Sequence, residues 1–307
     1  MEQIKVSVII PVYNTEPYVK QTVESIMKQT LHDIEIIIIN DGSTDNSLSI
    51  LSKLADLDNR IKIYSQTNQG LSVSRNAGMQ KATGEYIYFM DSDDLLEKDT
   101  LESCYQKCIS EQLDFVFFDA ESFCDENIFL RKYQYQRSLK IEEKVWNGLE
   151  LLKIQDATWN YRSSACLSFT KLIFLKKNNI QFYPHILHED ELYTAQLYLN
   201  ATRINYIKRN FFKRRIRSNS ITTIQFSMKN MNGYFTVANE LKKYKNRNNS
   251  KIINNHLAKV LNAAVWNASK LPVKDRLHIA RCCIFNYFGY VSCKTIGILL
   301  FKSLLKK

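Results

Sequence analysis

Two acidic segments of the sequence could bind a cation or a nucleotide. Asp91-Ser-Asp93 comes directly after the apolar run Tyr86–Met90, which predicts a buried strand. Two carboxylates at positions i and i+2 of a turn can face one divalent cation, because hard cations take carboxylate and phosphate oxygens. Asp41 follows a second apolar run, Ile34–Ile39, and could accept a hydrogen bond from a base or a ribose. The simpler interpretations are a helix cap for the first segment and a turn at Asp41-Gly42 for the second.

Two common nucleotide-binding motifs are missing from the sequence. The first apolar run ends in Pro11-Val-Tyr-Asn14, where a dinucleotide-binding fold would carry G-x-G-x-x-G. The P-loop pattern G-x-x-x-x-G-K-[ST] occurs nowhere in the chain. Dinucleotide-dependent dehydrogenases and P-loop NTPases are therefore disfavoured.

The elements that must position these residues alternate along the first 120 residues. This alternation predicts an α/β fold, a doubly wound and mostly parallel sheet with helices on both faces. Ligands of such sheets bind beyond the carboxyl ends of the strands, which is where the acidic segments lie. The predicted strands are Ile4–Ile10, Ile34–Ile39, Ile61–Tyr64, Tyr86–Met90 and Phe115–Phe118, and the predicted helices are Tyr18–Gln29, Ser47–Leu57, Leu71–Lys81 and Thr100–Gln112.

Beyond residue 120 the pattern becomes mainly helical. We expect a catalytic domain over residues 1–225, with a nucleotide-binding half (1–120) and an acceptor half (121–225), followed by a helical region over 226–307. The segment Phe123–Leu139 could form a hairpin or an extended crossing. The helical windows are Gly148–Gln155, His188–Asn200, Met228–Tyr244, Ile252–Ser269 and Asp275–Leu305.

Charge is divided unevenly along the 307 residues, whose 42 Lys/Arg and 31 Asp/Glu give a net charge of +11. Residues 1–130 carry 10 Lys/Arg against 22 Asp/Glu, a net charge of −12, whereas residues 131–307 carry 32 against 9, a net charge of +23. The basic half predicts an anionic partner, which could be nucleic acid, lipid headgroups or phosphates. A hydrophobic content of 45% excludes a disordered chain.

The seven cysteines form no CxxC pair, and in a chain of this size they predict reduced, mostly buried thiols. The apolar run Val6–Val12 is too short for a signal peptide, and no stretch approaches the ~18 apolar residues of a membrane-spanning helix. We therefore expect a cytoplasmic protein that is soluble or lies on the inner face of the plasma membrane.

Four segments, in order, resemble the family 2 glycosyltransferases of the GT-A fold that build bacterial polysaccharides. They are Val6-Ser-Val-Ile-Ile-Pro-Val-Tyr-Asn14, Asn40-Asp-Gly-Ser-Thr-Asp45, Asn68-Gln-Gly-Leu-Ser-Val-Ser-Arg-Asn-Ala-Gly78 and Gly84-Glu-Tyr-Ile-Tyr-Phe-Met-Asp-Ser-Asp-Asp94. The resemblance implies an inverting transfer of a sugar from a nucleotide-sugar to a saccharide or a lipid-linked acceptor. A UDP-sugar is the favoured donor, with GDP and dTDP sugars as alternatives, and Mn²⁺ or Mg²⁺ is the implied cofactor.

The resemblance also implies roles for single residues. Asp41 would accept a hydrogen bond from the base, Asp91 would lie near the ribose, and Arg75 near the base or the phosphates. Asp93 would bind the metal, which bridges the diphosphate. The implied nucleotide-binding residues are Pro11, Val12, Tyr13, Asn14, Asp41, Asn68, Arg75, Asp91 and Ser92.

A catalytic base is expected near residue 190. The segment His188-Glu-Asp-Glu-Leu-Tyr193 resembles the Glu-Asp element of the same family, whose Asp takes the proton of the acceptor hydroxyl. Asp190 is the candidate base, and Glu189 would position it or the acceptor. The alternative is a helix that merely begins with an acidic turn, and His188 is expected to form a local hydrogen bond.

A basic segment, Phe211–Ile221, resembles the family element that closes over the diphosphate. Many relatives carry His where this chain has Arg217, and Arg binds phosphate in a bidentate manner but does not bind metals. We expect Arg215 and Arg217 to bind phosphate, and Lys213 and Arg214 to belong to a solvated basic face.

The tail 285–307 places apolar residues opposite basic ones on a helical wheel. Ile296, Leu299, Leu300 and Leu304 oppose Lys294, Lys302 and Lys306. Such a helix could lie on an anionic membrane or dock on the protein's own core.

Other functions stay open at this level. A nucleotidyltransferase, a non-catalytic nucleotide-sugar-binding protein and a nucleic-acid-binding protein are the alternatives. The acidic N-terminal half and the absence of a nucleic-acid recognition motif weigh against nucleic acid, so we expect no such partner.

Overall fold

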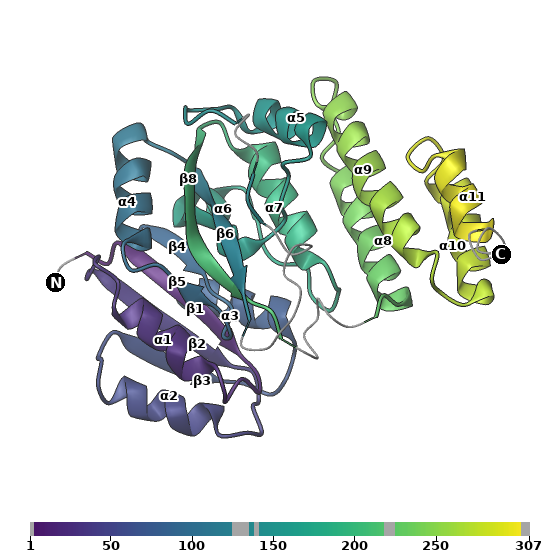
Figure 1. Cartoon of the computed structure of the whole chain (residues 1–307). Helices are drawn as coiled ribbons and strands as arrows, with labels where there is room; N and C mark the ends of the chain where they lie inside the picture. The colour runs from purple at the N-terminus through teal and green to yellow at the C-terminus, as the bar shows by residue number, and fades with distance from the viewer. Residues whose placement is uncertain (1–2, 125–134, 138–140, 218–224, 302–307) are drawn as a thin grey trace.

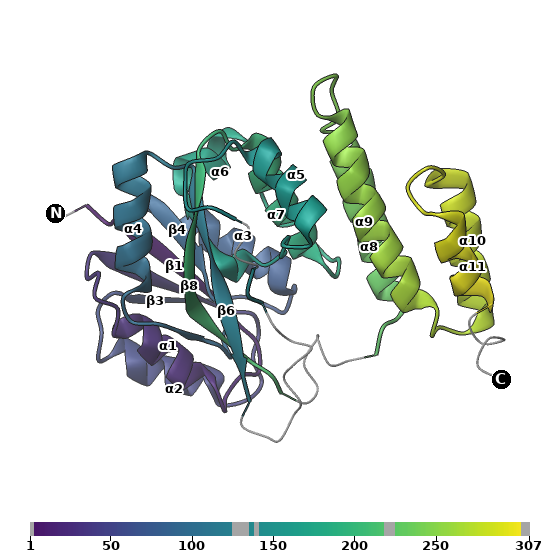
Figure 2. The same cartoon turned by 45° about the horizontal axis from the view of Figure 1, so that its top comes forward.

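The computed structural model describes residues 3–124, 135–137, 141–217 and 225–301. Their main feature is one eight-stranded mixed sheet of strand order β3-β2-β1-β4-β7-β6-β8-β5, with helices packed on both faces (Figure 1). Four further helices stand beside this α/β body and form the opposite end of the molecule in both views (Figures 1 and 2).

The first four strands pair in parallel, as the alternation of the sequence predicts. They are β1 (Val6–Val12), β2 (Ile34–Asn40), β3 (Ile61–Ser65) and β4 (Tyr86–Phe89). β1 and β2 are buried at all seven positions because helices cover both faces of the sheet. The carboxyl ends of β1, β2 and β4 therefore meet at one edge.

Alternate residues of β1 face two different hydrophobic clusters. Val8 and Ile10 pack with α1 (Val19–Met27), α2 (Ser47–Ala55) and α4 (Thr100–Glu111). Ile9 lies on the other face, where Met79 of α3 (Leu71–Lys81) contributes to the second cluster. This two-sided burial fixes the register of the strands and hence the position of the loops that follow them.

The other half of the sheet departs from the parallel pattern. β7 (Ser168–Lys171) lies antiparallel between β4 and β6 (Phe115–Phe123), and β5 (Leu95–Leu96) lies antiparallel to β8 (Ile204–Arg215). β5 and β7 were not expected, because runs of two and four residues carry little periodicity. Most of the segment Phe123–Leu139 lies outside the described residues.

The helices of the second half include one correction. The window Asp275–Leu305 is not one helix, because α10 ends at Asn286, Gly289 adopts a φ of 87°, and α11 begins at Cys293. The helices are α5 (Gly148–Thr158), α6 (Leu172–Lys177), α7 (Glu189–Asn200), α8 (Met228–Lys242), α9 (Ser250–Ala268), α10 (Val273–Asn286) and α11 (Cys293–Phe301).

A third hydrophobic cluster joins these C-terminal helices to α7. Leu299 of α11 is fully buried in it, and Ile296 and Leu300 pack against it. Of the two alternatives for the tail, the structure therefore supports docking on the protein's own core for these three residues rather than a membrane-facing arc. Leu304, Lys302 and Lys306 lie outside the described residues. Among the described helices, none is both long and apolar enough to span a bilayer.

Candidate active site

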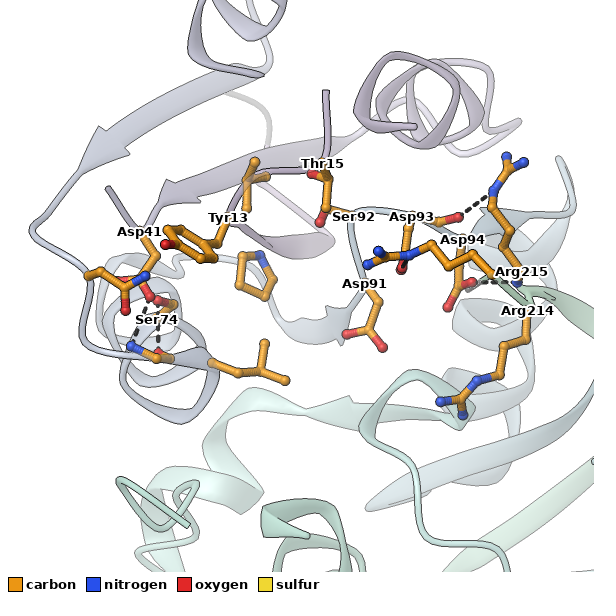
Figure 3. Close-up of a pocket in the computed structure, with 16 residues that line it drawn as sticks. Tyr13, Thr15, Asp41, Ser74, Asp91, Ser92, Asp93, Asp94, Arg214 and Arg215 are labelled. Carbon is orange, nitrogen blue, oxygen red and sulfur yellow. Dashed lines mark hydrogen bonds and ion pairs between the residues drawn. The ribbon is translucent and has the colours of Figure 1, made fainter. Parts of the chain in front are cut away.

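An elongated cavity of about 430 Å³ lies at the carboxyl ends of β1, β2 and β4 (Figure 3). Tyr13 and Asp41 stand at one end, and the turn Asp91–Asp94 stands at the other with Arg214 and Arg215 (Figure 3). The sequence-predicted residues that line it are Pro11, Val12, Tyr13, Asp41, Asn68, Asp91, Ser92, Asp93, Arg215 and Arg217. Asn14, Arg75, Glu189 and Asp190 are not among the lining residues.

Asp41 organises one wall of this cavity. Its carboxylate accepts hydrogen bonds from Gln66 Nε2 at 2.8 Å, from the backbone N–H of Gln69 at 2.9 Å and from that of Gly70 at 2.8 Å. Gly42 allows the close approach of this loop, because a Cβ there would lie 2.9 Å from the Asn68 nitrogen. The carboxylate thus fixes the loop 66–70 that leads into α3. The contacts of Gln66 and Gln69 with Asp41 were not predicted from the sequence.

Asn14 ties two of the strand-end loops together. It adopts a φ of 49°, and its Oδ1 accepts a hydrogen bond from the backbone N–H of Thr44 at 2.8 Å. Its Nδ2 donates to Thr44 Oγ1 at 3.2 Å. Asn14 therefore supports the cavity from outside by joining the loop after β1 to the loop after β2.

The turn after β4 carries three carboxylates in different environments. Asp94 is buried and accepts a hydrogen bond from the backbone N–H of Arg215 at 2.6 Å. Burial and the charges of Asp93 and Asp91 raise the pKa of Asp94 well above its ordinary value. The helix-cap interpretation fails for this residue, because α4 begins only at Thr100.

Arginines from the end of β8 face this acidic turn. Arg217 Nε lies 2.7 Å from Asp93 Oδ2, and Arg215 Nε donates to the backbone oxygen of Asp93 at 2.9 Å. The guanidinium of Arg215 stacks on the rings of Tyr18 and Phe123 at 4.9 and 4.6 Å from their centroids. These contacts hold two cations at the acidic end of the cavity.

Arg214 also lines the cavity, so its assignment to a solvated face is wrong. Its guanidinium extends toward Asp91 (Figure 3). Burial alone would lower the pKa of Arg214, but the negative charge of Asp94 and Asp91, with Tyr135, raises it. Lys213, by contrast, points outward and pairs with Glu97 at 2.6 Å, as expected for that residue.

A second charged cluster centres on Arg75, whose side chain is almost completely buried. One guanidinium nitrogen lies 2.8 Å from Asp91 Oδ1, and the other lies 3.0 Å from Glu189 Oε1 and 2.9 Å from Asp190 Oδ1. The guanidinium also packs on the ring of Phe182, 4.9 Å from its centroid. Arg75 therefore links the end of β4 to the first turn of α7, and its contact with the base or the phosphates stays a prediction.

Two of the carboxylates around Arg75, Glu189 and Asp91, differ in their affinity for protons. Burial, with the charge of Asp190, raises the pKa of Glu189 to about 7. Burial also acts to raise the pKa of Asp91, but Arg75 and Arg214 outweigh it and leave this pKa below its ordinary value. Asp91 is thus held ionised by its arginines, whereas Glu189 can carry a proton near neutral pH.

His188, at the start of α7, forms a hydrogen bond as expected, but its partner lies 42 positions away on α8 and is not local. Its Nε2 lies 3.1 Å from the Nδ2 of Asn230, and its ring stacks on Tyr234 with centroids 4.1 Å apart. Burial lowers its pKa to about 4, so the ring is neutral at physiological pH. His188 therefore joins the acidic turn of α7 to helix α8.

A second cavity, of about 640 Å³, opens beside the first. The two share Gly70 and Leu71 at the start of α3, and Glu189 lines the second. Its far wall comes from α8, through Lys229, Asn232, Gly233 and Thr236. Gly233 permits this approach, since a Cβ there would lie 2.1 Å from the Leu187 oxygen. Sequence reasoning did not identify α8 as part of the site.

The acidic turn fits a cation that is shared with a ligand rather than held by protein alone. Among the described residues, no group of three or more His, Cys, Asp or Glu side chains is arranged to hold a metal. Asp93 offers one carboxylate inside the cavity, beside Arg215 and Arg217. Mg²⁺ and similar ions commonly take one or two carboxylates and complete their shell with phosphate oxygens and water. These donors fit an ion that arrives with a diphosphate.

Comparisons with known sequences show which protein family is similar to this chain. The family model "Glycosyl transferase family 2" matches residues 7–172. Glycosyltransferase GlyG of Streptococcus pneumoniae is 33% identical over 226 residues, which are 73% of this chain and 74% of GlyG. Glycosyltransferase GlyA of the same organism is 32% identical over 223 residues, which are 72% of this chain and 32% of GlyA. The chain therefore spans about a third of the length of GlyA.

Solved structures share the fold over nearly the whole chain. S. aureus TarS 1–349 in complex with UDP-GlcNAc superposes with a TM-score of 0.76 at 21% identity, covering 98% of this chain and 85% of TarS 1–349. Mannosyltransferase PcManGT from Pyrobaculum calidifontis, in complex with GDP-Man and Mn²⁺, gives a TM-score of 0.62 at 14% identity, covering 100% of this chain and 87% of that one. Both comparisons support the GT-A-like arrangement of sheet and helices.

Proposed function

Because the chain belongs to glycosyl transferase family 2, we propose that it transfers a sugar, with inversion, from a UDP-sugar to a hydroxyl of a saccharide or lipid-linked acceptor. One observation carries the proposal. Two cavities meet at Gly70 and Leu71, and the carboxylates bound to Arg75 lie beside that junction. Such an arrangement suits a reaction in which one substrate supplies a group and a second substrate receives it.

The first cavity suits a nucleoside diphosphate. Tyr13 and Asp41 stand at the end where a base would bind, with Pro11, Val12 and Asn68 as walls. Arg214, Arg215 and Arg217 stand at the other end, where guanidinium groups would bind the diphosphate oxygens. The complex of TarS with UDP-GlcNAc supports this choice of donor by analogy of fold.

Asp190 acts as the general base in this proposal. The acceptor oxygen attacks the anomeric carbon, the bond from that carbon to the diphosphate oxygen breaks, and the acceptor proton passes to the Asp190 carboxylate. Arg75 orients Asp190 through the contact of 2.9 Å, and its positive charge offsets the negative charges of the carboxylates around it. The bonding electrons leave with the diphosphate, whose added charge the β8 arginines stabilise.

Asp93 would hold the divalent cation, Mn²⁺ or Mg²⁺. When bound, such an ion supplies Lewis-acid stabilisation of the leaving diphosphate. Arg217, which pairs with Asp93 in the free protein, would leave this carboxylate when the cation binds and would bind the phosphate instead. The cation and the diphosphate would occupy the same part of the cavity. The Mn²⁺ complex of PcManGT supports the choice of ion by analogy of fold.

The second cavity suits the acceptor. Glu189 lies in its wall, next to Asp190, and α8 encloses its other side. A role in cell-surface polysaccharide synthesis, on the cytoplasmic side and close to the membrane, is the setting that we propose for this reaction. Helix α8 lies beyond residue 172, where the match to the family model ends.

Three alternatives are less well supported. A nucleotidyltransferase would need a Gly-rich basic loop after β1, and Pro11-Val-Tyr-Asn14 stands there. A nucleic-acid-binding protein would present its arginines outward, whereas Arg214, Arg215 and Arg217 line the cavity. A non-catalytic nucleotide-sugar-binding protein would not need the Asp190 and Glu189 cluster.

A nucleotide panel followed by a transfer assay tests the proposal. We expect UDP to raise the melting temperature more than GDP, dTDP or CDP do, and Mn²⁺ to enlarge the shift, because a ligand that binds the native state stabilises it. UDP-sugars should then release UDP when an acceptor is present. Release of pyrophosphate from a nucleoside triphosphate and a sugar phosphate would favour the nucleotidyltransferase, and binding without turnover would favour the non-catalytic alternative.

A further inference from the structure

The outer face of α10 carries large apolar side chains that no part of the described chain covers. Val273, Leu277, Ile284, Phe285 and Phe288 follow one another at helical spacing along α10 and just beyond it. Leu277 is 56% exposed, Phe285 74% and Phe288 82%. An apolar row of this kind commonly marks a site of interaction with a protein or a membrane. We propose that this face, the α10 face, binds the surface of an anionic lipid bilayer.

The α10 face is separate from the residues that hold the helix in the fold. Ile279, Cys283 and Tyr287 point the other way and are buried in the third hydrophobic cluster. The buried Arg276 donates two hydrogen bonds of 3.1 Å to the backbone oxygens of Leu299 and Leu300. Folding therefore uses one side of α10 only, and stability of the fold does not explain the phenylalanines on the other side.

The charges around the α10 face select an anionic partner. Lys270, Lys274, Arg281 and Lys294 are exposed on or near this helix, and Asp275 is the only acidic residue between positions 270 and 294. Basic residues interleaved with exposed apolar ones are typical of helices that lie in the headgroup region of a membrane. A second copy of the chain fits less well, because a symmetric contact would bring the same cations together.

A shallow hollow in the same face suits a phosphate headgroup. It has a volume of about 350 Å³ and is lined by His278, Arg281, Cys282, Phe285 and Asn286. The Arg281 guanidinium lies 5.9 Å from the centroid of the Phe285 ring. Arginine binds phosphate oxygens in a bidentate manner, and the ring next to it would enter the apolar layer.

The position of α10 in the molecule suits this role. α10 and α11 form the end farthest from the sheet in both views, and α8 and α9 stand between them and the active-site body (Figures 1 and 2). Binding by this end would leave the donor cavity uncovered. The inference needs no assumption about sugar transfer, so it stands or falls independently of the proposed activity.

Vesicle co-sedimentation of the full chain tests the inference. The vesicles contain phosphatidylcholine alone or with one third phosphatidylglycerol. The Phe285→Gln/Phe288→Gln variant should lose binding to the anionic vesicles by more than tenfold, since each buried ring contributes on the order of tenfold. Lys274→Glu/Arg281→Glu should lose at least about 25-fold, or about fivefold for each basic residue removed, because each such residue near an anionic surface contributes about that much.

The matched control is Leu57→Gln/Trp159→Gln, which removes two apolar side chains of similar exposure (77% and 74%) far along the sequence from α10. Control and wild type should bind alike, and all variants should melt as the wild type does, because none of these side chains is buried. Equal binding by wild type and the phenylalanine variant would overturn the inference. So would a wild-type dimer, measured by sedimentation velocity, that the phenylalanine variant converts to monomer.

Discussion

Arg217 Nε lies 2.7 Å from Asp93 Oδ2, so the side chain that we expect to bind phosphate is paired with the carboxylate that we expect to bind a cation. Both are partly exposed in the donor cavity. A diphosphate and a cation that enter together would satisfy the two side chains separately. The ion pair would then form again when the products leave, so the acidic end of the cavity would stay neutralised throughout the proposed cycle.

Replacing Arg217 tests the phosphate side of this pair. Arg217→Gln should weaken UDP binding about tenfold or more, because a charge-assisted hydrogen bond contributes roughly 1.5–3 kcal/mol. Isothermal titration with UDP measures the effect, and uridine, which lacks phosphate, should bind both proteins equally. Lys208→Gln, at an exposed basic residue of β8, the strand that Arg217 follows, is the control. Unchanged UDP affinity in Arg217→Gln would remove Arg217 from the donor site.

Replacing Asp93 tests the cation side. Asp93→Ala should abolish the gain in UDP affinity that Mn²⁺ confers and leave the melting temperature of the free protein nearly unchanged, because a partly exposed carboxylate contributes little packing. Titrations with and without Mn²⁺ give the comparison. If Mn²⁺ still strengthens UDP binding in the variant, the ion is held elsewhere.

The first turn of α7 provides a test of the base. Asp190→Asn should bind UDP normally and lose transfer by about 10²–10⁴-fold, because general-base catalysis contributes that much and Asn cannot accept the proton. Glu189→Gln should cost less if Glu189 only positions Asp190 or the acceptor. Transfer rates and donor affinities of both variants decide. Normal transfer in Asp190→Asn with loss in Glu189→Gln would assign the base to Glu189.

The raised pKa of Glu189 predicts a dependence of stability on pH. Its pKa rises from 4.5 to about 7 through burial and the charge of Asp190. Between these values the folded protein holds a proton that the unfolded chain has released, so the free energy of unfolding falls as the pH rises through 7. Glu189→Gln removes this titration. The wild type should lose stability between pH 5 and pH 8 and the variant should not. The melting temperature of the variant minus that of the wild type should therefore increase by a few degrees from pH 5 to pH 8.

Glu102→Gln, an exposed carboxylate of α4, is the matched control for that experiment. Differential scanning calorimetry at both pH values gives the difference directly. A Glu189→Gln difference that stays constant between pH 5 and pH 8 would contradict the raised pKa.

Lys229 tests the acceptor cavity. No carboxylate within the described part of the chain forms an ion pair with it, and it lines the cavity beside Glu189. We expect the acceptor to carry negative charge there, so that Lys229→Glu raises the KM for the acceptor about tenfold or more and leaves donor affinity unchanged. Lys251→Glu on α9 is the control. An equal KM in wild type and Lys229→Glu would favour a neutral acceptor or a different entrance.

The donor cavity was largely predictable because its residues follow parallel strands. Pro11, Asp41 and Asp93 are distant in the sequence, but strands that pair in parallel bring the loops after them to one edge. The pattern of short apolar runs was enough to place them there. The same reasoning predicted the first four strands themselves.

The positions of Arg75 and Arg214 could not be predicted from the sequence, for two physical reasons. Arg75 meets Asp190 across 115 residues, and no local pattern encodes such a contact. Arg214 lies on β8, whose pairing with β6 shifts register around Asp119. This strand was not predicted, so no pattern in the sequence indicated which of its side chains face the cavity. The α8 wall was missed because it depends on how two helices dock.

In the proposed mechanism, helix α3 connects donor recognition to proton transfer through one rigid segment. The Asp41 carboxylate holds the start of α3 in place by accepting a hydrogen bond from the backbone N–H of Gly70. Arg75 lies in the second turn of the same helix. At about 1.5 Å per residue, Leu71 and Arg75 are separated by about 6 Å along the helix axis. This spacing is set by backbone geometry and is independent of the base or sugar that binds. Substitutions at Pro11, Tyr13 or Asn68 can therefore change donor choice during evolution while the carboxylates at Arg75 stay in place.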